Sequence, residues 1–118
     1  MSYSPNVYNT TIPAGITGVT GGIYSVTPVA YGYCSGGSSG TGSGLFNCTT
    51  TCINSVNGTY TITIAYGSYT NLCPIATPAQ GGNTIGVVSI VGNVITINGF
   101  ATTGNPQVTA FYFVVYGN

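Results

Sequence analysis

The sequence lacks every residue that carries charge near neutral pH. Its 118 residues include no Lys, Arg, Asp, Glu or His, whereas about one quarter of an ordinary soluble domain is charged. General acid and base catalysis, phosphate binding and most metal sites depend on those side chains. A Ser or Thr hydroxyl without an adjacent base is also a poor nucleophile. The composition therefore predicts no enzyme, no catalytic residue, no metal site and no cofactor.

The absence of charge and of long apolar runs also limits the partners. Nucleic-acid binding relies on Lys and Arg to neutralise phosphates, so we expect no nucleic-acid partner. No apolar run approaches the ~20 residues of a transmembrane helix, so no membrane span is predicted. The polar residues after Met1 do not resemble a signal peptide. If the protein is extracellular, either its leader was removed before this numbering begins or it leaves the cell by lysis or budding.

The scarcity of titratable groups predicts an unusual response to pH. Acid denaturation largely reflects protonation of carboxylates and charging of buried His, and neither is present. Besides the termini, only the four Cys and ten Tyr can change charge, and they do so well above neutrality. We expect a nearly constant free energy of folding from strong acid to about pH 8. This suits a harsh exterior, although a neutral one is equally compatible.

A net charge of zero favours association and precipitation, so either glycans keep the protein soluble or association is its role. Three segments match the N-glycosylation pattern, starting at Asn9, Asn47 and Asn57. Asn57 is the best candidate of the three, because Asn57-Gly58 also predicts a turn. N-linked glycans are therefore possible partners.

Four cysteines in a small domain predict two disulfides and an oxidising compartment. Cys34, Cys48, Cys52 and Cys73 allow three pairings. We favour Cys34 with Cys48 and Cys52 with Cys73, because the first pair would close the Gly- and Ser-rich stretch that follows Cys34. The spacing C-x13-C-x3-C-x20-C is unlike that of zinc fingers or ribbons, so disulfides are preferred over a zinc site.

The residue pattern predicts an all-β protein. Thr, Val, Ile and Tyr are abundant and strong helix formers are scarce. Residues 59–66 alternate between Tyr or Ile on one face and Thr on the other, and Gly92-Asn93 joins two apolar segments in a second predicted hairpin. Residues 108–116 predict a central strand buried on both faces. Residues 23–33 predict another strand, which Pro28 restricts to an edge or a bulge.

Taken together, these segments give six to eight short strands separated by regular turn signals. That pattern is typical of a single small β-sandwich or jelly-roll-like domain. We predict that this domain covers residues 23–118 and that residues 1–22 form an N-terminal extension.

Residues 12–22, IPAGITGVTGG, have the pattern of an extended strand. Ile12, Ala14 and Ile16 are two apart and would share one face, and we include Val19 in the same segment. Such a strand can add to the open sheet of a neighbouring molecule. The alternative is that this region is the first strand of its own domain, or coil. Gly21-Gly22 favours exchange, because a segment leaving its own domain needs a flexible joint.

The tyrosines are a second candidate site. They would line either a sugar-binding face or the core and a subunit interface, where Tyr is enriched, and we favour the latter. Calcium-assisted sugar binding is excluded because no carboxylate exists. The tyrosines considered are Tyr3, Tyr8, Tyr24, Tyr31, Tyr33, Tyr66 and Tyr69.

A charge-poor β-domain rich in Thr, Asn, Tyr and Gly, with glycosylation motifs and a separate N-terminal strand, resembles the subunits of archaeal extracellular filaments. The thread-type fibres of thermoacidophilic archaea are the nearest case. The resemblance covers the overall composition and residues 7–22 and includes no specific motif. It implies assembly by donor-strand complementation and heavy glycosylation, and it carries over no catalytic residue.

These observations predict a structural subunit of an extracellular or cell-surface filament. Each copy would insert its N-terminal strand into the next, giving a head-to-tail homopolymer whose contact does not close on itself. Two alternatives stay open: a coat or appendage protein of an archaeal virus, and a monomeric glycan-binding adhesin.

Overall fold

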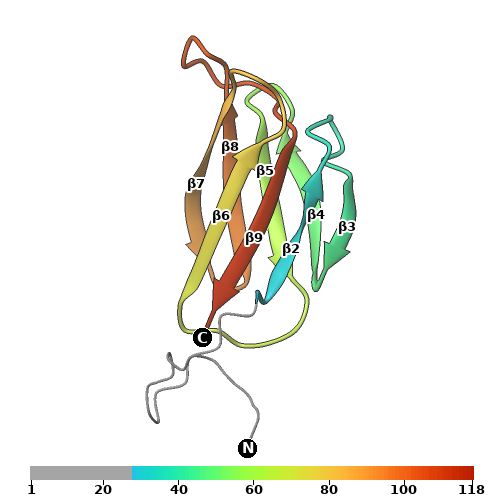
Figure 1. Ribbon diagram of the computed structural model, residues 1–118, viewed down its shortest axis with the longest axis vertical. Helices are drawn as coiled ribbons and strands as arrows, with labels where there is room; N and C mark the ends of the chain where they lie inside the picture. The colour runs from blue at the N-terminus through green and yellow to red at the C-terminus, as the bar shows by residue number, and fades with distance from the viewer. Residues whose placement is uncertain (1–27) are drawn as a thin grey trace, which may run out of the picture.

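Two antiparallel sheets face one another in the computed structural model, which describes residues 28–118 (Figure 1). The first sheet has the order β3 (Gly42–Phe46), β2 (Ala30–Cys34), β9 (Phe111–Gly117), β6 (Leu72–Pro78). The second has the order β4 (Cys48–Asn54), β5 (Thr59–Ile64), β8 (Val94–Phe100), β7 (Thr84–Val91). The predicted all-β class and small β-sandwich are confirmed. The predicted N-terminal extension and its boundary lie outside the described residues.

The core lies between the sheets and is built from alternating strand residues. Tyr60, Ile62 and Ile64 of β5 are all buried, as their alternation with Thr predicts. The ring of Tyr60 packs edge-on against Phe111 of β9, with centroids 5.6 Å apart. Burial of each such side chain contributes about 1.5–3 kcal/mol. The core is therefore made mainly of Ile, Val and aromatic residues from β5, β8 and β9.

Tyr60 makes the fold sensitive to alkali. Its hydroxyl donates to the carbonyl of Gly36 at 2.6 Å, and burial, helped by the nearby Cys52 and Cys34, raises the pKa of Tyr60 from 10.0 to about 12. The folded state therefore favours the protonated phenol. This stabilisation is complete below pH 10 and is lost as the pH rises through 12.

We accordingly expect the melting temperature to stay constant from pH 2 to pH 8 and to fall between pH 10 and pH 12, as measured by circular dichroism. Tyr60→Phe should lower the melting temperature at neutral pH, because it loses the hydrogen bond to Gly36, and should reduce the alkaline fall. An unchanged melting temperature at pH 12 in the wild-type protein would contradict this prediction.

One predicted hairpin is confirmed, and the predicted turn at Asn57-Gly58 is present but has a different length. Val91 pairs with Val94 across Gly92-Asn93, and Gly92 has φ 58°, which suits the first central position of a type II′ turn. The β4–β5 connection is longer than the predicted two-residue turn at Asn57-Gly58, since it covers residues 55–58. The Asn54 side chain explains this, because its Oδ1 accepts hydrogen bonds from the backbone of Val56 and Asn57.

Two further predictions about strands are wrong. β9 is central, as predicted, but it is not buried on both faces, because Tyr112 is 58% exposed. A sandwich has only two layers, so the outer face of each sheet meets solvent. β2 is an interior strand rather than an edge strand, and the irregularity in its pairing with β3 lies between Tyr31 and Tyr33 rather than at Pro28. Pro28 does not restrict it, because the strand begins after the proline, at Ala30.

Candidate functional site

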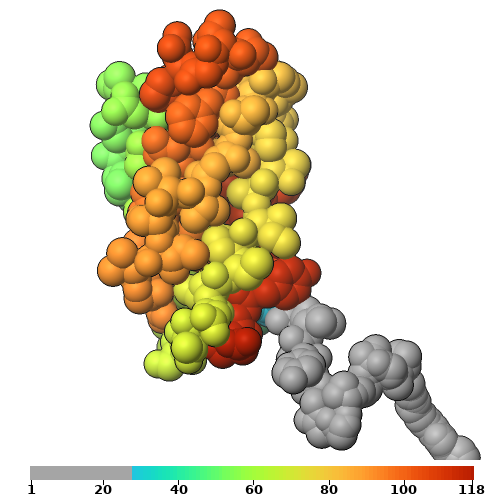
Figure 2. Space-filling model, turned by 90° about the vertical axis from the view of Figure 1, so that its left-hand side faces the viewer, coloured from blue at the N-terminus to red at the C-terminus, as the bar shows by residue number. Residues whose placement is uncertain are grey.

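Within residues 28–118, the sandwich is open along the side bordered by β6 and β7, which we call the β6/β7 side. Each of these strands is the outermost strand of its sheet, and the chain crosses between them through residues 79–83 at one end only. Figure 2 faces this side, with β6 in yellow and β7 in light orange. The side chains of β6 and β7 are therefore the ones that border this edge of the core.

Two core-facing residues of β7 are only half covered. Ile90 lies opposite Ile95, and Val87 lies opposite Ile97. Residues opposite each other in an antiparallel pair share a face of the sheet. Both β8 partners are fully buried, yet Ile90 is 41% and Val87 is 42% exposed. The apolar core is therefore incompletely covered along β7.

The inward-facing residues of β6 carry few atoms to cover this gap. Pro74, Ala76 and Pro78 lie opposite buried residues of β9, so they face the core. All three are half-buried. Short side chains on β6 and half-exposed ones on β7 together leave apolar surface on the β6/β7 side.

The free edge of β6 is protected against pairing by its prolines. The carbonyl of Val115 accepts a hydrogen bond from Val29 at 2.8 Å, so it points away from β6. Pro74, which lies opposite Val115, is therefore in a non-hydrogen-bonded pair, and its backbone faces outward. Ala76 and Pro78 follow Pro74 at intervals of two residues, so their backbone groups also face outward. Of these three residues, only Ala76 has a backbone N–H that could donate to an added strand. An added strand would find few donors on β6.

The free edge of β7 carries no such protection. β7 has the sequence TIGVVSIV over eight residues, without proline or charge. Val88 and Val91 are 59% and 73% exposed. A β-bulge between Val87 and Ser89 is its single irregularity. Long apolar edges without charged residues are the usual sites of strand addition, so β7 is the strongest candidate for pairing with another segment.

The opposite side of the sandwich is more polar and is closed by a short connection. Asn47 alone joins β3 to β4, with φ 55°. Its Nδ2 donates to the carbonyls of Val29 and Tyr66, both at 3.0 Å, and its Oδ1 accepts from the backbone N–H of Tyr66. The inward-facing residues of β4 include Thr50 and Cys52. Exposed core surface on this side is therefore less apolar than on the β6/β7 side.

The geometry distinguishes the predicted glycosylation sites. The Nδ2 atom of Asn47, which would carry a glycan, is already bound to two carbonyls, so modification there would disrupt the β3–β4 connection. Asn57 is exposed in the β4–β5 turn and leaves room for a glycan. Asn9 lies outside the described residues, as do the predicted donor-strand residues Ile12, Ala14, Ile16 and Val19.

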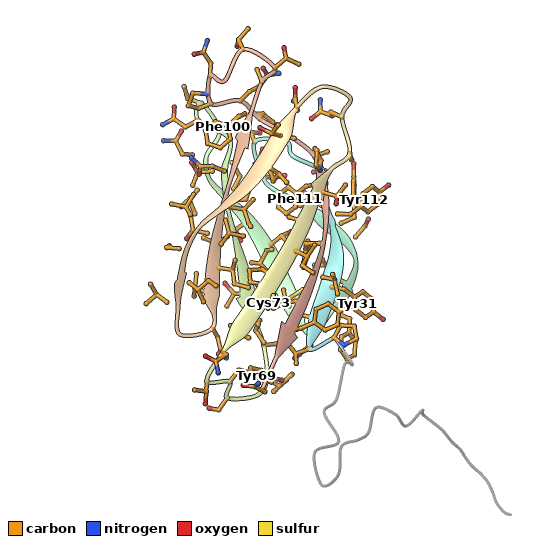
Figure 3. All side chains as sticks on the ribbon, turned by 60° about the vertical axis from the view of Figure 1, so that its left-hand side comes forward. Tyr31, Tyr69, Cys73, Phe100, Phe111 and Tyr112 are labelled. Atoms are coloured by element: carbon orange, nitrogen blue, oxygen red, sulfur yellow. The ribbon has the colours of Figure 1, made fainter. Side chains whose placement is uncertain are left out.

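The structure describes all four cysteines in the reduced, free-thiol state, which contains neither favoured disulfide. The pairing of Cys52 with Cys73 is wrong for a geometric reason. Cys52 lies opposite the buried Tyr60 and faces the core, whereas Cys73 lies opposite Tyr116 on the outer face of the other sheet. Figure 3 shows Cys73 on β6. Cys34 and Cys48 are buried, and burial raises the pKa of both thiols.

The outer face of the first sheet forms an aromatic surface. Tyr31 stacks on Phe46 with ring centroids 5.0 Å apart, and Tyr33 packs against Tyr112 at 4.9 Å. Tyr31 and Tyr112 project from the same face in Figure 3, away from the core residue Phe111. Two shallow hollows meet at Tyr112 and Phe113. One is lined by residues of β2 and β3, and the other by residues of β6.

The predicted tyrosine site is only partly assembled by this surface. It includes Tyr31 and Tyr33, whereas Tyr66 and Tyr69 lie in the connection after β5. Tyr3, Tyr8 and Tyr24 lie outside the described residues. Sequence reasoning missed Tyr112 and Phe46. The alternation of Tyr112 with two Phe residues was a signal that its side chain points away from the core.

Among residues 28–118, no helix is long and apolar enough to cross a membrane. Comparison of the chain with protein-family models, with curated proteins and with solved structures gives no match.

Proposed function

We propose that this protein is a structural, non-catalytic subunit of an extracellular filament of the pilus or thread kind. Residues 12–19 of one copy would add to the β7 edge of the next. One observation carries the proposal: the core-facing side chains of Val87 and Ile90 are half exposed beside a free, uncharged edge strand.

The chemistry of the two segments is complementary. Ile12, Ala14 and Ile16 share one face of an extended chain, and this face would cover Val87 and Ile90. Main-chain hydrogen bonds to β7 would supply affinity, while the side chains would supply the fit. Neither segment contains a charge, so assembly would depend on apolar burial and should respond little to ionic strength.

Chain direction favours a donor from another molecule. β2 begins at the same end of the sandwich where β7 ends (Figure 1). If residues 12–19 returned to their own β7 by the shortest route, they would run parallel to it, whereas every ladder among residues 28–118 is antiparallel. An antiparallel return would require residues 20–27 to span the length of β7, which takes nearly their full extension of about 26–29 Å. A neighbouring copy has no such constraint.

The contact also explains the assembly form and suits an exterior location. A donor strand and an acceptor edge are different surfaces, so the contact is heterologous and gives an open fibre unless the rotation closes a ring. The expected insensitivity to acid and the exposed Asn57 motif are consistent with an extracellular or cell-surface protein. A coat or appendage protein of an archaeal virus would use the same contact and is the first alternative.

A glycan-binding adhesin is the second candidate, and the aromatic surface favours it. Tyr31, Tyr33 and Tyr112 offer stacking faces and hydroxyl groups around a shallow hollow. Neutral aromatic surfaces of this kind suit neutral sugars. If the protein is a glycan-binding adhesin, we expect a monomer that binds its glycan without residues 1–20.

The decisive experiment compares the full chain with a chain lacking residues 1–20. We expect electron microscopy to show fibres of the full chain at pH 2 and pH 7, and sedimentation to show only monomers of the truncated chain. The cause is loss of the strand that covers the β7 edge.

A peptide of residues 10–22 should bind the truncated chain, and the same peptide with Ile12→Asn and Ile16→Asn is the matched control. Fibres from the truncated chain, or a monomeric full chain at every concentration tested, would contradict the proposal.

A further inference from the structure

We infer that Cys34 and Cys52 form a disulfide that joins the two sheets at the end of the sandwich where β2 ends. This inference does not depend on filament formation. It also replaces the pairing expected from the spacing of the cysteines. It begins with the direction of the two side chains, which come from different sheets and both face the core.

Cys34 is the last residue of β2 and lies opposite the buried Phe111. Cys52 in β4 lies opposite the buried Tyr60. The rings of Phe111 and Tyr60 are in contact across the core. The partners of the two cysteines therefore meet between the sheets, at the same level of the sandwich.

The β2–β3 loop holds the two cysteines against the same residue, Gly40. The Cys34 thiol donates to the carbonyl of Gly40 at 3.6 Å. A Cβ atom added to Gly40 would lie 3.0 Å from the Cα of Cys52. The backbone N–H of Cys52 also donates to the carbonyl of Ser39 at 3.1 Å. The thiol of Cys34 and the backbone of Cys52 thus both lie against Gly40.

Thr50 locates Cys34 along β4. The hydroxyl of Thr50 donates to the same Gly40 carbonyl at 2.7 Å, and it lies beside the Cys34 side chain. Cys34 therefore lies beside the stretch between Thr50 and Cys52. Cys48 lies at the start of the strand, where its thiol donates to the carbonyl of Tyr31 at 3.7 Å. Besides burial, the nearby Cys52 raises the pKa of the Cys34 thiol, which is consistent with the two side chains lying close together.

Oxidation would break the two S–H bonds and form one S–S bond. The two electrons and two protons would pass to a small-molecule disulfide, which becomes two thiols. Burial raises the pKa of the Cys34 thiol, which lowers the amount of reactive thiolate once the domain is folded. We therefore expect the bond to form during folding in an oxidising compartment and to stay closed afterwards.

The test is a mass measurement on protein refolded with a small-molecule disulfide as oxidant. The Cys73→Ser variant is the background, because the exposed Cys73 would otherwise join separate chains. Chymotrypsin should release residues 34–46 and 47–60 as one linked peptide, which separates on reduction. Because both Cys48 and Cys52 lie in the second peptide, Ser substitutions identify the partner. The link should remain in Cys48→Ser and disappear in Cys52→Ser.

The bond should also stabilise the domain. Reduction of the Cys48→Ser protein should lower its melting temperature by about 10–20 °C, as expected for closing a loop of this size in a small domain. Reduction should leave the melting temperature of Cys52→Ser unchanged.

A link that survives in Cys52→Ser but not in Cys48→Ser would overturn the inference. So would quantitative alkylation of both thiols in the refolded and then denatured wild-type protein.

Discussion

Ile90→Lys should abolish filament formation while leaving the sandwich folded. In the free subunit the Ile90 side chain is 41% exposed, so a lysine there can extend its ammonium group into water. An added donor strand would bury that group against an apolar core without a partner, at a cost of several kcal/mol. Since about 1.4 kcal/mol is a factor of ten, we expect the critical concentration for assembly to rise at least about 100-fold.

The control for this prediction is Val91→Lys in the same strand. Val91 lies opposite Val94 on the outer face of the sheet and is 73% exposed. It adds the same charge to the subunit without placing it in the donor contact. Sedimentation at increasing protein concentration measures assembly, and circular dichroism confirms that both variants are folded. Equal assembly by the two folded variants would show that the β7 edge does not receive the donor.

Local pattern predicts part of this fold because some strands have a clear alternation of apolar and polar residues. The core face of β5 follows from Tyr60, Ile62 and Ile64, and the β7–β8 hairpin follows from Gly92-Asn93. β4 and β6 were not predicted. β4 reads CTTTCIN and has almost no apolar alternation, whereas β6 contains two prolines. Both exist because they pair with strands that local pattern does predict, β5 and β9.

The candidate site depends still more on long-range structure. The residues of β7 are plainly apolar in the sequence, but their exposure depends on the order of the strands. Val87 and Ile90 would be core residues if β7 lay inside its sheet, and they are half exposed because it is the last strand. The cysteine pairing could not be predicted for the same reason, since spacing along the chain does not reveal that Cys73 faces outward and Cys52 inward. The donor residues Ile12 and Ile16 stay a prediction from sequence.

Gly58→Ala should destabilise the whole domain by about 3–5 kcal/mol. Gly58 ends the β4–β5 turn with φ 61°, a conformation that costs a residue with a Cβ atom about 1–2 kcal/mol. An added Cβ would also collide with the carbonyl oxygen of Gln107 and would lie 2.8 Å from the nitrogen of Val108. These are backbone atoms just before β9, so the collision is not relieved by a side-chain rotation.

Gly44→Ala separates these two costs. Gly44 has nearly the same φ, 59°, but an added Cβ there meets no atom within 4 Å. This variant should therefore lose only the cost of the backbone conformation, about 1–2 kcal/mol. Thermal unfolding should show a fall of about 15–30 °C for Gly58→Ala and of under about 15 °C for Gly44→Ala. Similar falls would mean that the β4–β5 turn moves away from Gln107 at little cost. A large difference would mean that this turn and the entry to β9 are packed rigidly, at the end of the sandwich that the Cys34–Cys52 bond would also fix.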